Sequence, residues 1–310
     1  MDQSIHTSPS TPVAVSDEQF AQVGDDIELC YQTFGDPDDD PLLLVMGLGG
    51  PMNWWDAELC EMLAERGFYV VRYDNRDTGR SSRGTGRVTR AMLVSAFAGR
   101  RVKVPYTLTD MADDAFGLMD HLGLESAHVV GVSMGGMIAQ TMAIGQPARV
   151  RSLTSIMSTT GRRTVGWQHP SLLPNLLAKR GGREVYIEST VVVWNRIGSP
   201  GYPHTEERVR ARAAETWDRG ISSAGVLRQM LAVITQPNRG PRLRALRMPA
   251  LVVHGLADKM VHVSGGRATA AAIPGAELLL IDGMGHDLPP TLFETFVSAI
   301  ERVAERAQRS

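Results

Sequence analysis

One serine of the chain stands between glycines directly after an apolar run: GVSMGG (residues 131–136) follows AHVV (127–130). A serine hydroxyl is a weak nucleophile unless a base takes its proton and an acid orients that base. Gly-x-Ser-x-Gly between a buried strand and a helix is typical of a sharp turn that lifts the hydroxyl above the strand end. A small-residue turn that only opens a helix is the alternative. The valine-rich strand and the apolar helix around it favour Ser133 as a nucleophile.

A candidate acid and a candidate base lie in two loops near the end of the chain. Asp258 follows the apolar run 250–253, and His286 follows the apolar run 277–281. Loops at the carboxyl ends of parallel strands meet at one edge of a sheet. Serine, then acid, then histidine is also the chain order of the fold that uses Gly-x-Ser-x-Gly. We therefore predict that His286 is the base and that Asp258 orients it.

Three other residues compete for these two roles. His254 also lies at a strand end, but it precedes the acid and suits structural hydrogen bonds better. Asp282 is a rival acid that lies only four residues from His286 in the same loop. Asp287 is adjacent to the histidine and would point elsewhere. A surface position is the alternative for His286 itself, and its glycine neighbours and strand-end placement argue against that.

Two backbone N–H groups are expected to bind the oxyanion of a tetrahedral intermediate. One is the N–H of Met134, which follows the nucleophile. The other comes from the loop GLGG at residues 47–50, where position favours Leu48, with Gly47 and Gly49 as the next candidates. The same glycines suit a tight turn into a helix, and both uses are compatible because the turn aims the amide.

Alternating strand and helix patterns position these loops. Apolar runs predict strands at residues 27–34, 41–46, 68–73, 128–132, 150–157, 250–253 and 277–281. Most of these runs are short and continuously apolar, as in strands buried on both faces. Helical patterns lie at residues 55–66, 107–122, 134–144, 266–273 and 292–306, with Thr109 as a candidate N-cap. Repeated β-α-β units predict an α/β fold with a doubly wound, mostly parallel sheet.

Residues 160–238 interrupt this alternation. Their pattern is helical with Gly and Pro interruptions, and VVV at 191–193 is the only obvious strand-like run. We predict a helical cap over residues 160–238, inserted into a core of residues 23–159 and 239–310. Residues 1–22 lack the cationic start and apolar core of a signal peptide and are predicted to form a disordered tail.

The predicted cap is rich in aromatic residues. Most of them are expected to pack a small core, but some would line a substrate pocket if the cap covers the site. Methionines could add an adaptable apolar wall. These features favour a lipid-like or bulky ester, a thioester or a phospholipid acyl bond over a sugar or a peptide. The candidate pocket residues are Gly47, Gly49, Trp167, Trp194, Trp217 and Met230.

Composition excludes other classes of function. The net charge of −2 gives no general reason to expect nucleic acid or an anionic membrane as a partner. No run of 18 apolar residues predicts a membrane span, so a cytoplasmic location is the default expectation. Cys30 and Cys60 fall in a predicted strand and a predicted helix, which indicates neither a disulfide framework nor a metal site.

One segment does not fit the pattern of the core. Residues 83–103 place six basic residues around AMLVSAFA (91–98). An amphipathic element at a lipid surface has this composition. A partly packed loop and helix with solvated arginines explains it as well and is the more economical interpretation.

Six stretches together resemble the serine esterases of the α/β-hydrolase fold: VMGLGG, RYDNRDTGRSS, LTDMADDAFGLMDHLG, VVGVSMGGMIAQ, HGLADKMV and IDGMGHDLP. The resemblance is strongest to the branch with the LipG-type lipases/esterases and the aclacinomycin methylesterases. It covers residues 27–157 and 249–303. It implies carboxylic-ester hydrolysis through an acyl-enzyme, with Ser133, Asp258 and His286 as the triad and with no cofactor.

One departure from the family pattern lies in the oxyanion loop. The usual His-Gly opening is replaced by Met46-Gly47. The donor is a main-chain group, so the change removes a supporting side chain at most. It argues against a proline iminopeptidase, which carries His-Gly-Gly-Pro-Gly.

Several functions share these motifs. A serine nucleophile argues against epoxide hydrolases and haloalkane dehalogenases, which attack with a carboxylate. Methylesterases of bulky polyketide-like esters, cofactor-free haloperoxidases and carbon–carbon bond hydrolases stay open. A ligand-binding module without catalysis is disfavoured because all three triad residues are present.

Overall fold

The computed structural model describes residues 12–172 and 181–309, and one eight-stranded sheet forms its centre. The strand order is β1-β2-β4-β3-β5-β6-β7-β8. β1 and β2 pair antiparallel, β2 is antiparallel to β4, and every neighbouring pair from β4 to β8 is parallel. The predicted α/β class with a mostly parallel sheet is confirmed. The strands are β1 (Gln19–Gly24), β2 (Ile27–Phe34), β3 (Asp40–Val45), β4 (Phe68–Tyr73), β5 (Ala127–Val132), β6 (Val150–Ile156), β7 (Ala250–Gly255) and β8 (Glu277–Ile281).

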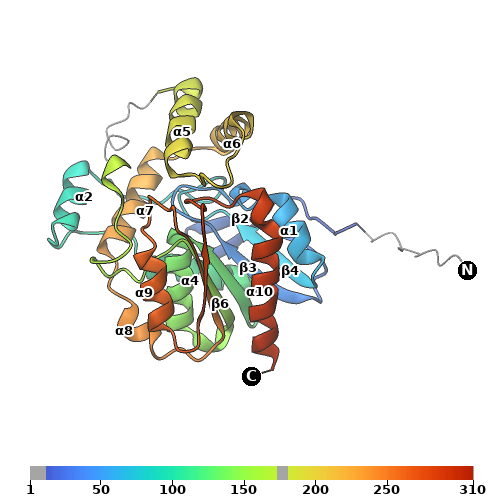
Figure 1. Cartoon of the computed structure of the whole chain (residues 1–310). Coiled ribbons are helices and arrows are strands. Elements are labelled where there is room, and N and C mark those ends of the chain that lie inside the picture. Colours follow the sequence, from blue (N-terminus) through green and yellow to red (C-terminus); the bar gives the residue numbers. More distant parts are fainter. Residues whose placement is uncertain (1–11, 173–180, 310) are drawn as a thin grey trace, which may run out of the picture.

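Helices cover both faces of the sheet (Figure 1), which is why β4, β5 and β7 are buried along their whole length. α3 (Leu108–His121) and α4 (Met134–Gly145) pack into the apolar cluster on one face. α1 (Ala57–Ala64) and α10 (Phe293–Gln308) pack into the cluster on the other face. α8 (Gly240–Leu243) and α9 (Ser264–Ala272) lie on the α4 side, and α2 (Arg90–Phe97) lies farther out.

In the described part of the chain, the inserted region between β6 and the short helix α8 contains α5 (Arg183–Ile197), α6 (Glu206–Arg219) and α7 (Ser223–Thr235). α5 and α6 lie beyond one end of the sheet in Figure 1. The expected strand at residues 191–193 is wrong, because these valines lie inside α5. Its buried residues Ile187 and Val191 are four positions apart, which gives the helix an apolar side to pack.

Two local expectations also need correction. The predicted tail over residues 1–22 does not reach residue 22, because Val15 bridges Phe34 and β1 begins at Gln19; residues 1–11 lie outside the described part. Polar and apolar side chains alternate along β1, so the sequence has no continuous apolar run that would have predicted this strand. Thr107, not Thr109, caps α3: Thr107 Oγ1 accepts the N–H of Asp110, whose carboxylate accepts the Thr107 N–H at 2.7 Å.

Candidate active site

Ser133 occupies a tight turn between β5 and α4, with φ +57° and ψ −118°. A positive φ is uncommon for any residue other than glycine, so the surroundings must hold it. The Ser133 N–H donates to Ile156 O at 2.9 Å. A Cβ on Gly131 would lie 2.2 Å from Gly135 O, and one on Gly135 would lie 2.0 Å from Val45 O. The glycines of the motif are therefore required by close backbone approach.

The structure brings the three predicted triad side chains together. His286 Nε2 lies 3.0 Å from Ser133 Oγ, and His286 Nδ1 lies 2.8 Å from Asp258 Oδ2. The His286 side chain is 11% exposed and that of Asp258 is fully buried. The three residues come from loops after β5, β7 and β8. This geometry permits the imidazole to take the serine proton while the carboxylate holds its second nitrogen.

The buried carboxylate of Asp258 is held by main-chain donors and histidines. Its Oδ1 accepts the N–H groups of Met260 and Val261 at 2.8 and 2.9 Å. Burial alone would raise the pKa of Asp258, but the charge of His286 and the contacts with His254 and His286 outweigh burial and hold that pKa well below its ordinary value. Asp258 is thus an ionised carboxylate at neutral pH.

The rival residues take other positions. His254 is fully buried, and its Nε2 lies 2.8 Å from Val261 O and 3.4 Å from Asp258 Oδ2. It holds the loop of the acid rather than contacting the serine. Asp282 is exposed to solvent. Asp287 is buried and contacts Ser199 Oγ and, at 2.8 Å, His204 Nε2.

The loop after β3 lies directly beside the nucleophile. A Cβ on Gly47 would lie 3.2 Å from Ser133 Cβ. The Gly49 N–H already donates to Gln229 Oε1 at 2.8 Å. Within residues 12–172 and 181–309, the N–H groups of Leu48 and Met134 have no acceptor. Met134 also begins α4, where the first N–H groups and the helix dipole favour negative charge.

Gln229 is a site-building residue that sequence reasoning missed. It lies on α7 and is fully buried. Its Nε2 donates to Arg76 O at 2.8 Å and to Thr78 Oγ1 at 2.9 Å, while its Oε1 accepts from Gly49. A buried amide with all of these partners fixes the loop at residues 47–50 against the inserted region. Nothing in an amphipathic helical pattern distinguishes such a glutamine from a surface one.

The inserted region also contacts the loop that carries His286. The His286 N–H donates to Ile197 O at 2.7 Å, at the end of α5. The neighbouring Gly285 N–H donates to Ser199 Oγ at 2.8 Å. A Cβ on Gly285 would lie 2.3 Å from Gly198 O. The chain just after α5 therefore clamps the backbone of the histidine loop.

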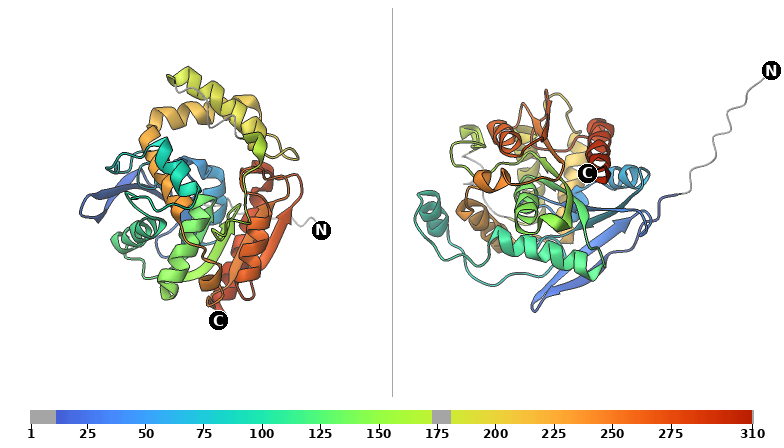
Figure 2. Two further views of the ribbon diagram at one scale, coloured as in Figure 1. Left: turned by 90° about the vertical axis from the view of Figure 1, so that its left-hand side faces the viewer. Right: turned by 90° about the horizontal axis from the view of Figure 1, so that it is seen from below.

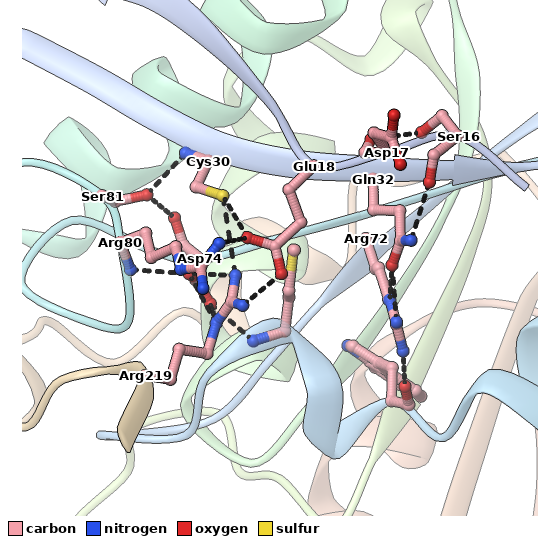
Figure 3. A network of polar contacts seen from close by, with 12 residues as sticks. Ser16, Asp17, Glu18, Cys30, Gln32, Arg72, Asp74, Arg80, Ser81 and Arg219 are labelled. Atoms are coloured by element: carbon pink, nitrogen blue, oxygen red, sulfur yellow. Dashed lines mark hydrogen bonds and ion pairs between the residues drawn. The ribbon is translucent and has the colours of Figure 1, made fainter. Parts of the chain in front are cut away.

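A polar network ties α6 to the core (Figure 3). Arg219 Nη2 lies 2.8 Å from Asp74 Oδ2, and Asp74 Oδ1 accepts the Met52 N–H at 2.7 Å. Burial would raise the pKa of Glu18, but its hydrogen bond to Arg219 and the charges of Arg219 and Arg80 together outweigh burial and lower that pKa. Burial raises the pKa of the Cys30 thiol in the same network to about 12, so it is no nucleophile at neutral pH.

The three predicted pocket tryptophans each pack against another aromatic ring. Trp167 is 45% exposed and stacks on His262, with ring centroids 4.2 Å apart. Trp194 packs edge-on against Trp54 at 5.5 Å, and Trp217 packs on Tyr186 at 5.6 Å. These contacts belong to packing within the inserted region and onto the core.

Of the other predicted pocket residues, Gly47 and Gly49 lie in the loop after β3, and Met230 is half-buried on α7. A cavity of about 10 Å³ is lined by Trp194 and His204, and an open one of about 550 Å³ is lined by Ile187 and Glu206. None of the triad residues lines either cavity.

Residues 12–172 and 181–309 contain neither a membrane-spanning helix nor a cluster of metal-ligating side chains. No helix in these ranges is long and apolar enough to cross a bilayer. No group of three or more His, Cys, Asp or Glu side chains there could hold a metal ion. Cys30 and Cys60 are both buried free thiols.

The sequence of the chain is similar to those of known proteins. Residues 40–291 match the family model described as alpha/beta hydrolase fold. The chain is 30% identical to rhodomycin D methylesterase DauP of Streptomyces sp. (strain C5), over 89% of this chain and 94% of that protein. It is 24% identical to 3-oxoadipate enol-lactonase 2 of Acinetobacter baylyi, over 91% and 94% of the two chains.

A solved structure gives the same fold. The enol-lactonase from Burkholderia xenovorans LB400 superposes with a TM-score of 0.72 at 23% identity, covering 93% of this chain and 100% of that one. The family model spans most of the chain, and the resemblance expected from the six motifs is confirmed. The protein belongs to the α/β-hydrolase fold family.

Proposed function

We propose that the protein is a serine hydrolase that cleaves carboxylic esters through an acyl-enzyme. One observation carries this proposal: His286 lies within hydrogen-bond distance of both Ser133 Oγ, at 3.0 Å, and Asp258 Oδ2, at 2.8 Å. Nucleophile, base and orienting acid are thus in contact in the order that acyl transfer requires.

Each group has a defined task in the proposed reaction. Ser133 Oγ attacks the ester carbonyl carbon while its proton passes to His286 Nε2. The carbonyl oxygen becomes an oxyanion, which the N–H groups of Leu48 and Met134 stabilise. The tetrahedral intermediate collapses, the C–O bond to the alcohol breaks, and the imidazolium protonates the leaving alkoxide. Water then attacks the acyl-enzyme by the same route and releases the acid and Ser133.

The electrostatics of Asp258 support this mechanism. Because its pKa lies well below the ordinary range, the carboxylate stays ionised throughout the neutral pH range. It holds the Nδ1–H tautomer of His286, so that Nε2 faces Ser133 as a proton acceptor. It also stabilises the imidazolium that forms when the serine proton is taken.

The relatives bear on the substrate class. The matched proteins are named as a methylesterase and an enol-lactonase, and both names describe esters of small molecules. This supports a small-molecule ester and favours the methyl ester of a bulky polyketide-like acid over a lipid-like ester or a thioester. Haloperoxidase-type activity with the same triad is the second candidate, as a side activity, because the triad alone does not distinguish the two.

Covalent labelling tests the nucleophile directly. A fluorophosphonate probe should attach to the full chain at Ser133, as located by peptide mass spectrometry, and excess ester should slow the labelling. Ser133→Ala should not be labelled, whereas Ser298→Ala on α10 should label like the wild type. Equal labelling of Ser133→Ala and the wild type would reject Ser133 as the nucleophile.

A further inference from the structure

The charges of the chain are unevenly distributed along its sequence. The chain has 34 acidic and 32 basic residues, yet no Asp or Glu occurs at residues 78–109, 126–183, 219–257 or 259–276. These stretches contain α2, α4, α7, α8 and α9. The overall charge of −2 therefore hides segments that are purely cationic.

The acid-free segments lie together in the fold. α2 packs against α7, and α8 packs against both α4 and α9. Arg163 Nη2 donates to Ala96 O at 2.9 Å, which joins the chain after β6 to α2. α2, α7, α8 and α9 lie along the left of Figure 1, and the left view of Figure 2 faces that side. Asp258, the one acid between the last two of these stretches, is buried.

Cations without ion-pair partners surround α2. The arginines and the lysine that flank this helix are all exposed. None of them forms an ion pair with another residue in the described part of the chain. Arg244 and Arg247 continue the exposed cations near α8. A surface of one sign with no internal neutralisation attracts an anionic partner. The cations flanking α2 are Arg87, Arg90, Arg100, Arg101 and Lys103.

Two large apolar side chains stand in the middle of these cations. Phe97 is 76% exposed and Val94 is 69% exposed, the highest values among the large hydrophobic residues in the described ranges. They are three positions apart and so share one side of α2. The helix packs inward through Ala96, in a cluster that also contains Leu231 of α7. The inward side is therefore occupied, and Phe97 and Val94 point to solvent.

We propose that α2 and its flanking cations, here called the α2 face, bind the surface of an anionic lipid bilayer. Phe97 and Val94 enter the boundary between headgroups and acyl chains, while the arginines pair with lipid phosphates and anionic headgroups. An apolar centre ringed by cations fits an interface that is apolar inside and anionic outside. A nucleic acid would bind the cations, but its phosphate backbone has no apolar surface against which Val94 could be buried. This proposal is independent of the proposed ester hydrolysis.

The test uses the full chain and vesicles of defined composition. The protein is sedimented with large vesicles of phosphatidylcholine alone, and with vesicles of equal parts phosphatidylcholine and phosphatidylglycerol. We expect binding to the anionic vesicles only, and weaker binding in high salt because the attraction is electrostatic. Phe97→Ser and the double variant Arg100→Gln/Arg101→Gln should each weaken binding by about tenfold.

Matched controls separate binding through the α2 face from nonspecific binding to vesicles. Phe20→Ser, at a 47% exposed phenylalanine on the edge strand, and Arg309→Gln, at an exposed arginine of the C-terminus, should bind like the wild type. Circular dichroism checks that every variant is folded. The proposal would be overturned if the wild-type protein did not sediment with anionic vesicles, or if the α2 variants bound as well as the controls. Binding to a DNA duplex without binding to vesicles would assign the face to nucleic acid instead.

Discussion

Gln229, on helix α7 of the inserted region, accepts the backbone N–H of Gly49 at 2.8 Å. Gly49 directly follows Leu48, whose N–H is the candidate oxyanion donor. The segment after α5 makes a similar contact to the loop of His286, through Ile197 O and Ser199 Oγ. The inserted helices therefore hold two of the loops that surround Ser133.

Replacing Gln229 tests the first of these contacts. Gln229→Leu leaves the Gly49 N–H without its acceptor, and we expect kcat to fall by about 10- to 100-fold with a small change in KM, because the oxyanion loop acts in the transition state. Gln229→Glu keeps the acceptor for Gly49 but loses the Nε2 donor to Arg76 O and Thr78 Oγ1, so a smaller loss than in Gln229→Leu would assign the effect to the Gly49 contact. Steady-state kinetics with a p-nitrophenyl ester measures both. Equal activity of Gln229→Leu and the wild type would remove Gln229 from the site.

Ser199 tests the contact with the histidine loop. Ser199→Ala removes the acceptor of the Gly285 N–H and the hydroxyl that contacts Asp287. Leaving buried polar groups unpaired costs about 1–3 kcal/mol. We expect a loss in kcat together with a changed pH dependence of kcat, because His286 loses its fixed position. Ser199→Thr, which keeps a hydroxyl, should recover part of the activity. A variant with an unchanged pH profile and only a lower melting temperature would mean that Ser199 is purely structural.

The sheet and the three side chains that meet at Ser133 could be predicted from the sequence, because both leave local patterns. Ser133 lies between Gly131 and Gly135, where close backbone approaches leave no room for a side chain, and Asp258 and His286 follow apolar strands. Gln229 and Ser199 have no such pattern, since their roles depend on contacts between residues about 180 and 86 positions apart. The valines of α5 show the opposite error: their β-propensity was outweighed by a helix that packs through Ile187 and Val191.

The choice between two candidate acids can be made by matched substitutions. Asp258→Asn removes the charge that holds His286 and should lower kcat by about 10³- to 10⁴-fold. Asp282→Asn changes an exposed residue of the histidine loop and should leave kcat within about twofold of the wild type. Both variants should unfold cooperatively when heated. A large loss in Asp282→Asn with an active Asp258→Asn would mean that the acid is misassigned.

His128 gives a prediction about stability and pH. Burial lowers its pKa to about 4, and its Nδ1 lies 2.8 Å from Ser152 Oγ in the core. The unfolded chain takes up this proton near pH 6.5 and the native chain only near pH 4, so stability falls as the pH decreases through this window. The loss should reach about 2 kcal/mol between pH 7 and pH 5. Urea unfolding at both pH values measures it. His128→Asn, which does not titrate, should lose less stability over the same step, and an equal loss would exclude His128 as the cause.

The most direct test of ester hydrolysis is kcat/KM of the full chain and of Ser133→Ala on one series of esters. The series runs from p-nitrophenyl acetate to p-nitrophenyl palmitate and includes the methyl ester of a bulky aromatic acid. The proposed mechanism predicts turnover by the wild type and a loss of about 10⁶-fold in kcat for Ser133→Ala. The ester with the highest kcat/KM then identifies the substrate class. Turnover that persists in a pure preparation of folded Ser133→Ala would contradict the central claim that Ser133 is the nucleophile.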